Sequence, residues 1–135
     1  MPFLDEIAAR IQSQGAGTLG TDLFLSTKAQ IPTGNGPYTT LVEYGGTTSR
    51  RTQNNKSTQR PSAQIVVRAS TYPNARTRAQ AVYAALGGDN GLFNTVLSST
   101  FYLWVIPNQQ LYDLGLDELS RARVAFNIDA EKDPS

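Results

Sequence analysis

The strict alternation of residues 121–129 constrains the fold of this chain more than any other sequence feature. Its positions divide into two sets, Ala122, Val124, Phe126 and Ile128 on one side and Arg121, Arg123, Ala125 and Asn127 on the other. Successive side chains of a strand point to opposite faces of a sheet, so the pattern predicts an antiparallel strand with one buried face. Such a strand requires a sheet and a second layer that covers its apolar face.

Six other segments complete the expected fold. Four are rich in β-branched, aromatic or aliphatic residues and are predicted strands: Thr21–Ser26, Tyr38–Tyr44, Ser62–Ser70 and Thr100–Ile106. Two carry apolar residues three and four positions apart and are predicted helices: Phe3–Gln14, and Asn74–Leu86 with Asn74 as its N-cap. The order predicts an α+β fold, in which two helices pack on one face of a mostly antiparallel sheet of about five strands. The polar tail Ala130–Ser135 is expected to be frayed.

Composition excludes several classes of chemistry. The 135 residues suit a single domain over 1–135, and 39% of them are apolar, which is enough for one core. The sequence contains no Cys and no His, which excludes disulfides, thiolate or imidazole metal sites and catalysis by a histidine base. We therefore expect no enzyme activity and no cofactor. The acidic start Met1–Glu6 and the lack of a long apolar run predict a protein without a signal peptide or membrane span.

Charge is distributed unevenly along the chain. The formal net charge is only +1, but seven basic residues and no acid lie between Glu43 and Asp89: Arg50, Arg51, Lys56, Arg60, Arg68, Arg76 and Arg78. The rest of the chain carries five basic residues and all eleven acids. The middle third is therefore a cationic block in an otherwise acidic protein.

The most informative part of that block is a basic arm at about 45–61, between the second and third predicted strands. Residues 47–60 include no large apolar residue, so they are not expected to add to a core. A loop of this length is usually functional or disordered. The arm could be a solvated loop, or it could become ordered against an anionic partner such as DNA or an acidic protein surface. Arg50, Arg51, Lys56 and Arg60 are the candidate contacts, and they would bind phosphates without sequence preference.

Two other clusters have competing interpretations. Asp113, Asp117 and Glu118 could bind Mg²⁺ or Ca²⁺, but the calcium-loop spacing is absent and a solvated turn explains them better. Trp104 lies in the aromatic segment Thr100–Ile106 and could stack on a nucleobase. Alternation along the strand instead favours a core position for some of these rings and an interface for the others. Few charged residues are present to disfavour pairing of this segment with another chain, so a homo-oligomer that covers it would explain its composition.

Five short motifs lie in order along the chain: GTLGTDLF (Gly17–Phe24), Glu43–Gly46, Arg60-Pro61 followed by QIVVR (Gln64–Arg68), the helix with Ala79, Ala81 and Leu86, and the closing Leu114–Asp129. Each motif is weak alone, but together they span nearly the whole chain. In this order they resemble the minor capsid or tail terminator family of long-tailed bacteriophages. The chain departs from the family pattern at Lys28–Pro37, which is longer, and at Thr47–Arg60, which is longer and more basic.

The resemblance implies a structural virion protein that is assembled in the host cytoplasm. It would form a homo-oligomeric ring, a hexamer in the family, which caps the tail tube and joins it to the head connector or stopper. The basic arm would then face the lumen or the adjoining tube and steer DNA passage or docking, and Gly45, Gly46 and Thr47 would contact the adjoining ring. Two alternatives stay open: a head–tail connector or stopper of the same junction, and a small nucleic-acid-binding protein that uses the arm.

Overall fold

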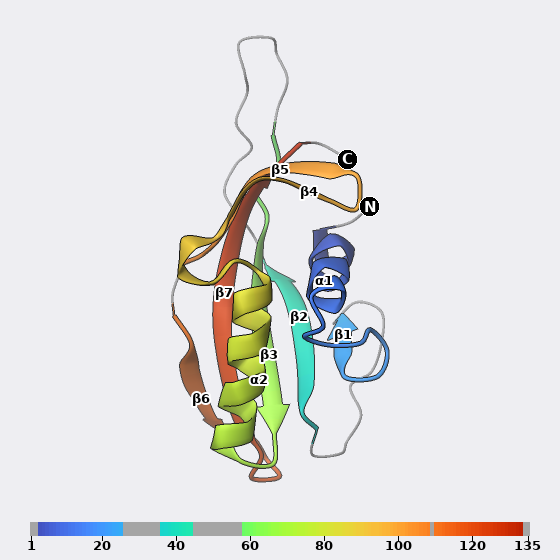
Figure 1. Cartoon of the computed structure of the whole chain (residues 1–135). Coiled ribbons are helices and arrows are strands. Elements are labelled where there is room, and N and C mark those ends of the chain that lie inside the picture. Colours follow the sequence, from blue (N-terminus) through green and yellow to red (C-terminus); the bar gives the residue numbers. More distant parts are fainter. Residues whose placement is uncertain (1–2, 26–35, 45–57, 109, 134–135) are drawn as a thin grey trace.

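The computed structural model of the protein describes residues 3–25, 36–44, 58–108 and 110–133 (Figure 1). Its elements are two helices, a short 3₁₀ helix and seven strands. In chain order they are α1 (Phe3–Ser13), β1 (Leu23–Leu25), β2 (Tyr38–Tyr44), β3 (Ser62–Ala69), α2 (Tyr72–Ala85), η1 (Gly88–Asn90), β4 (Leu92–Leu97), β5 (Thr100–Pro107), β6 (Tyr112–Leu116) and β7 (Ala122–Lys132). The α+β class is therefore confirmed.

All seven strands belong to one sheet, which runs in the order β1-β2-β3-β7-β5-β4. Only β1 pairs in parallel, with β2, so the expectation of a mostly antiparallel sheet is confirmed. β6 also pairs with β7, opposite Ala122–Ala125, whereas β5 pairs with the later residues Ile128–Lys132. Because β3 pairs along Ala122–Asp129, β5 and β6 must share the other edge of β7.

The alternation that predicted β7 is confirmed by its burial except at Ala125, which belongs to the opposite set but is also buried. Ala122, Val124, Phe126 and Ile128 are buried, and on the paired strand β3 the buried set is Ala63, Ile65, Val67 and Ala69. In register, Ile65 lies opposite Phe126 and Val67 opposite Val124, so these side chains form one continuous apolar face. The intervening residues of β3, among them Val66 and Arg68, point to the opposite face of the sheet.

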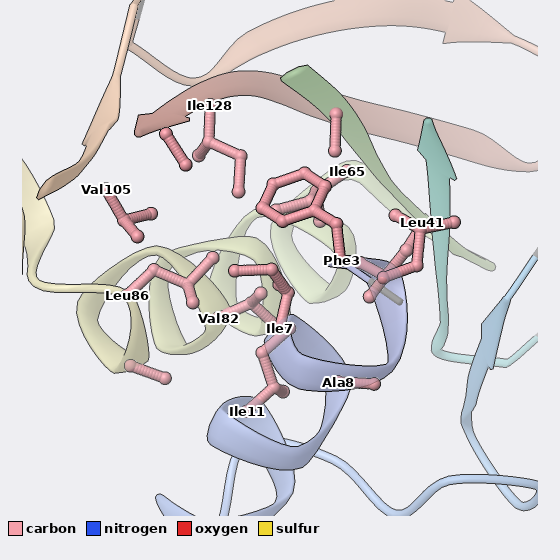
Figure 2. Packing of buried hydrophobic residues seen from close by; sticks show 14 of the residues in the cluster. Phe3, Ile7, Ala8, Ile11, Leu41, Ile65, Val82, Leu86, Val105 and Ile128 are labelled. Atoms are coloured by element: carbon pink, nitrogen blue, oxygen red, sulfur yellow. The ribbon is translucent and has the colours of Figure 1, made fainter. Parts of the chain in front are cut away.

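The core lies between this apolar face and side chains from both helices. Figure 2 shows Ile7 and Ile11 of α1 beside Val82 and Leu86 of α2, all directed toward the sheet. The sheet contributes Leu41, Ile65, Val105 and Ile128 to the same cluster. At the far end of α2, a smaller cluster joins Ala75 and Ala79 to Val67 and Val124.

The second helix starts earlier than the sequence predicted. Thr71, and not Asn74, is its N-cap, since the Thr71 hydroxyl accepts a hydrogen bond from the backbone N–H of Asn74 at 3.4 Å. Pro73 lies in the first turn, where its missing N–H costs no hydrogen bond. Asn74 was a plausible cap by residue type, but a Thr three residues earlier fits the same rule.

Two strands were missed, so the count of about five strands is wrong. β4 contains Asn94, whose φ of 49° interrupts the regular strand, and β6 contains Gly115 with a φ of 83°. Residues of these types weaken a strand pattern. The frayed tail is also wrong for Ala130–Lys132, which extend β7 and are buried. The predicted loop Lys28–Pro37 lies outside the described residues, except for Gly36 and Pro37.

Candidate assembly interface

Most residues of the predicted contact sites lie outside the described part of the chain. They are Gly45, Gly46, Thr47, Arg50, Arg51 and Lys56. Arg60 is described, and so are Tyr44 and Thr58, the residues on either side of 45–57. The functional surfaces can therefore be built from the place where the arm joins the sheet and from the exposed apolar residues of the described elements.

Residues Thr58, Gln59 and Arg60, here called the arm root, are tied to the end of β7. Gln59 and Lys132 exchange two backbone hydrogen bonds of 2.9 Å, and Ala130 N–H donates to the Pro61 carbonyl at 3.0 Å. The Thr58 hydroxyl donates to Glu131 at 2.7 Å, and the Arg60 guanidinium lies 4.0 Å from the same carboxylate. The arm therefore meets the sheet at a fixed position.

Beneath the arm root lies a buried ion pair. The Lys132 ammonium is 2.8 Å from the Glu6 carboxylate, and both side chains are at most 2% exposed. The Tyr102 hydroxyl donates to the same carboxylate oxygen at 2.7 Å. Burial and the Glu6 hydrogen bond raise the pKa of Tyr102 well above its ordinary value. One network thus joins α1, β5 and β7, and the sequence did not predict it because Lys132 lay in the expected tail.

The hairpin formed by β4 and β5 arches over the end of the molecule at which α1 begins and β7 ends (Figure 1). On its inner side, Tyr102 and Val105 are buried, which confirms the core positions expected for this segment. On its outer side, Phe93, Val96 and Phe101 are 59%, 61% and 37% exposed. We call these three residues the hairpin patch. Val96 lies opposite Phe101 in the ladder, and Phe93 lies opposite the partly buried Trp104.

A shallow groove of about 290 Å³ lies on the sheet face opposite the core. Its lining comes from β2, β3 and β7 and from the turn before β7: Tyr38, Thr40, Val42, Val66, Arg68, Asp117 and Arg123. The guanidinium of Arg68 lies 5.4 Å from the centre of the Tyr38 ring. Burial, followed by the nearby charge of Arg121, lowers the pKa of Arg68. The groove is thus an apolar strip with a cationic end.

The acidic segment before β7 forms a turn, as the sequence indicated. Asp117 accepts hydrogen bonds from the backbone N–H groups of Leu119 and Arg121 and pairs with the Arg121 guanidinium at 2.8 Å. Burial alone would raise the pKa of Asp117, but these donors together lower it below its ordinary value. Across the described residues, no group of three or more acids is placed to hold a metal ion. Nor is any described helix long and apolar enough to cross a membrane.

Comparison with known proteins decides the family. The profile described as bacteriophage tail terminator protein matches residues 10–134, nearly the whole chain. The protein belongs to the tail terminator family. Its likeness to that family, inferred above from motifs, is therefore confirmed, and so is its place in the virion tail.

A solved structure supports the fold of this tail terminator family member. A chain from the virion of a native gene transfer agent particle superimposes with a TM-score of 0.66 at 17% identity. The match covers 95% of this chain and 94% of that chain, so the two share the whole fold. No curated protein matches the sequence significantly. A structural tail family implies a protein without catalytic function.

Proposed function

We propose that this protein forms a closed ring that caps the tail tube and joins it to the head connector. The family match over residues 10–134 carries this proposal. A ring of identical subunits needs two different, mutually complementary surfaces on each subunit. The exposed apolar residues of this chain lie on several separate elements, including the β4–β5 hairpin and the segment Leu116–Leu119, which supports more than one contact per subunit.

A polymerisation assay tests the capping function. Purified tail tube protein is allowed to polymerise with and without this protein, and tube lengths are measured by electron microscopy. We expect tubes to stop growing and to carry a ring at one end when this protein is present. Unchanged tube lengths without end rings would contradict the proposal.

The alternative from the same junction is a connector or stopper ring. A pull-down with tail tube protein, set against one with the portal complex, distinguishes the two roles. Capture of the tube protein supports the terminator role. Capture of the portal complex alone would favour the connector.

We further propose that the basic arm faces the lumen or the adjoining ring, with Arg50, Arg51, Lys56 and Arg60 toward DNA and Gly45, Gly46 and Thr47 toward the neighbouring ring. The anchored arm root supports this, because it fixes where six or so identical arms would leave a ring. Replacing the four basic residues with Ser should leave the ring intact but impair tail joining or DNA ejection. Normal tails that eject DNA would contradict the assignment.

Arg60 needs its own control, since it also faces Glu131. A triple variant that keeps Arg60 separates the charge of the arm from the stability of its root. The half-buried Arg76 of α2 offers a second control, because its replacement with Ser removes a positive charge outside the arm. We expect the triple variant to be impaired and the Arg76→Ser variant to behave as the wild type.

A further inference from the structure

The hairpin patch is an exposed apolar surface in a part of the chain that carries no charge. From Asn90 to Tyr112 the sequence contains no acidic or basic residue. Its exposed side chains Phe93, Val96 and Phe101 therefore offer nothing to phosphates or to a charged protein surface. These three side chains therefore fit an apolar surface, while the groove beside Val96 adds Glu6 and Arg10 of α1 at the margin of the patch.

The patch also lies on the edge of the sheet. β4 is the last strand in the order β1-β2-β3-β7-β5-β4 and pairs only with β5 among the described strands. Proteins usually protect such an edge with charged residues or Pro, because an open edge pairs with other chains. β4 has neither. Asn94 interrupts this ladder at one position, and the edge that remains is uncharged and lies beside exposed aromatic rings, which is typical of a surface that is covered in the assembled state.

The hairpin is held rigidly from its other side. Leu97, Tyr102 and Val105 are buried in the main core, and the Tyr102 hydroxyl donates to buried Glu6. The backbone N–H of Asp133 donates to the Phe101 carbonyl at 3.0 Å. The patch is thus presented in a fixed shape, and binding would require little ordering of the hairpin.

The size of the patch indicates which assembly it fits. An aromatic side chain buries about 200 Å² and a valine less, so at the exposures observed the three residues offer at most roughly 300 Å². A stable pair of proteins needs about 800 Å² from each partner. The patch would therefore hold a lone dimer weakly. In a closed ring every subunit is held by two neighbours, and the ring stays linked even when one contact opens. Each contact can therefore be weaker than the single contact of a stable dimer.

We propose that the hairpin patch is the surface by which each subunit contacts the next copy of this chain in the ring. The inference rests on the ring proposed above and adds the contact that closes it. The next copy covers Phe93, Val96 and Phe101 and shields the edge of β4. The partly buried Trp104, opposite Phe93, lies at the margin of this contact.

The test compares ring formation by two patch variants and a control. Phe93→Lys and Val96→Lys place a charge in the patch at positions that are exposed in the subunit. Leu19→Lys is the matched control, because Leu19 is 49% exposed against 59% for Phe93 but lies in the connection between α1 and β1. Circular dichroism and thermal melting first establish that all three variants fold like the wild type.

Light scattering over a concentration series then measures assembly, with tail tube protein added if the ring needs it. We expect both patch variants to need a roughly tenfold or higher concentration to form the ring, while the control assembles like the wild type. The emission of Trp104, the only tryptophan, should shift to shorter wavelength as wild-type rings form. Folded patch variants that form rings at the wild-type concentration would overturn the inference, as would an equal loss in the control.

The same experiment distinguishes a failure of the proposed ring from a failure of the proposed patch contact. A wild-type protein that forms no ring with or without tube protein contradicts the proposed function. Patch variants that form rings but no longer cap tubes would show that the patch binds the tube protein, which overturns only the present inference. Cross-linking adds a direct readout: because the sequence has no Cys, a thiol-reactive photo-cross-linker attaches only at Val96→Cys and captures whatever surface covers that position. A cross-link between subunits is expected.

Discussion

At the scale of single residues, the buried pair of Glu6 and Lys132 is the most consequential contact. Two charges have been removed from water, and each is tolerated only because the other lies 2.8 Å away. Losing one partner leaves a buried, unpaired charge, whereas losing both leaves none. The effects of substituting Glu6 and Lys132 on the free energy of unfolding are therefore strongly non-additive.

We predict that Lys132→Met lowers the free energy of unfolding by about 3–5 kcal/mol. Adding Glu6→Gln to that variant should restore part of the loss, because no buried charge then remains. Urea unfolding followed by Trp104 fluorescence measures both. A double variant less stable than Lys132→Met alone would contradict the interpretation of the contact as a buried ion pair.

A second residue-scale prediction concerns Asp22, which ties the α1–β1 connection to α2. Burial would raise its pKa, but hydrogen bonds from the Thr18 N–H and the Arg78 guanidinium lower it below the ordinary value. A lowered pKa stabilises the fold above about pH 4, and that contribution is lost as the pH falls through the folded-state pKa. Asp22→Asn should therefore cost about 1 kcal/mol at pH 7 and less at pH 3. Equal costs at the two pH values, measured by urea unfolding, would contradict this.

The sequence predicted correctly which residues are buried where apolar residues recur at a regular spacing. It failed where the burial of a residue depends on one contact with a distant residue. The alternation of residues 122–128 identified the buried face of β7 because the period of a strand is two. No such rule places Lys132 in the core, since a lysine is buried only when a distant residue neutralises it. Its partner Glu6 lies 126 positions away in the sequence.

At the scale of elements, the connection from α2 to β4 depends on the lack of a side chain at Gly91. Its φ is 72°, and a Cβ there would lie 2.6 Å from Ile106 Cγ2 and 2.8 Å from the Val105 carbonyl oxygen. Gly88 also has a positive φ, of 60°, but has no atom within 4 Å of such a Cβ. The two positions separate backbone strain from steric overlap.

We predict that Gly88→Ala costs about 1 kcal/mol, the strain of a left-handed residue with a side chain. Gly91→Ala should cost roughly 1–3 kcal/mol more, because β5 must move to admit the methyl group. Thermal melting of both variants tests the difference. Equal melting temperatures would show that the close approach of Gly91 to β5 adds nothing to the cost of the Gly91→Ala substitution.

The sequence predicted elements according to the strength of their local signal. β2, rich in β-branched and aromatic residues, was predicted with its observed bounds, Tyr38–Tyr44. β4 and β6 were missed because their partners, and not their own residues, make them strands. β6 pairs with β7 across a bulge at Asp113 and Gly115, two residues typical of turns. Likewise, the hairpin patch could be suspected from the uncharged run but not assigned to a face, because Asn94 changes which side chains point outward.

At the scale of the whole molecule, the uneven charge separates the two leading classes of function. A terminator uses the basic arm inside an assembly, whereas a nucleic-acid-binding protein uses it alone. If the arm of an isolated subunit bound DNA through all four basic residues, affinity would fall steeply with salt, with a slope of about −4 on a logarithmic plot. We expect instead only weak binding of a short duplex by the unassembled protein, as measured by fluorescence anisotropy at two salt concentrations.

The mass of the purified protein in solution tests the ring most directly. Light scattering at low and high salt, with and without tail tube protein and a short DNA duplex, gives the number of subunits in each state. We predict one discrete ring, present from the start or formed when tube protein is added, with a mass that DNA does not determine. A monomer that ignores tube protein but binds DNA tightly, and loses that affinity steeply with salt, would contradict the assignment as a ring-forming terminator.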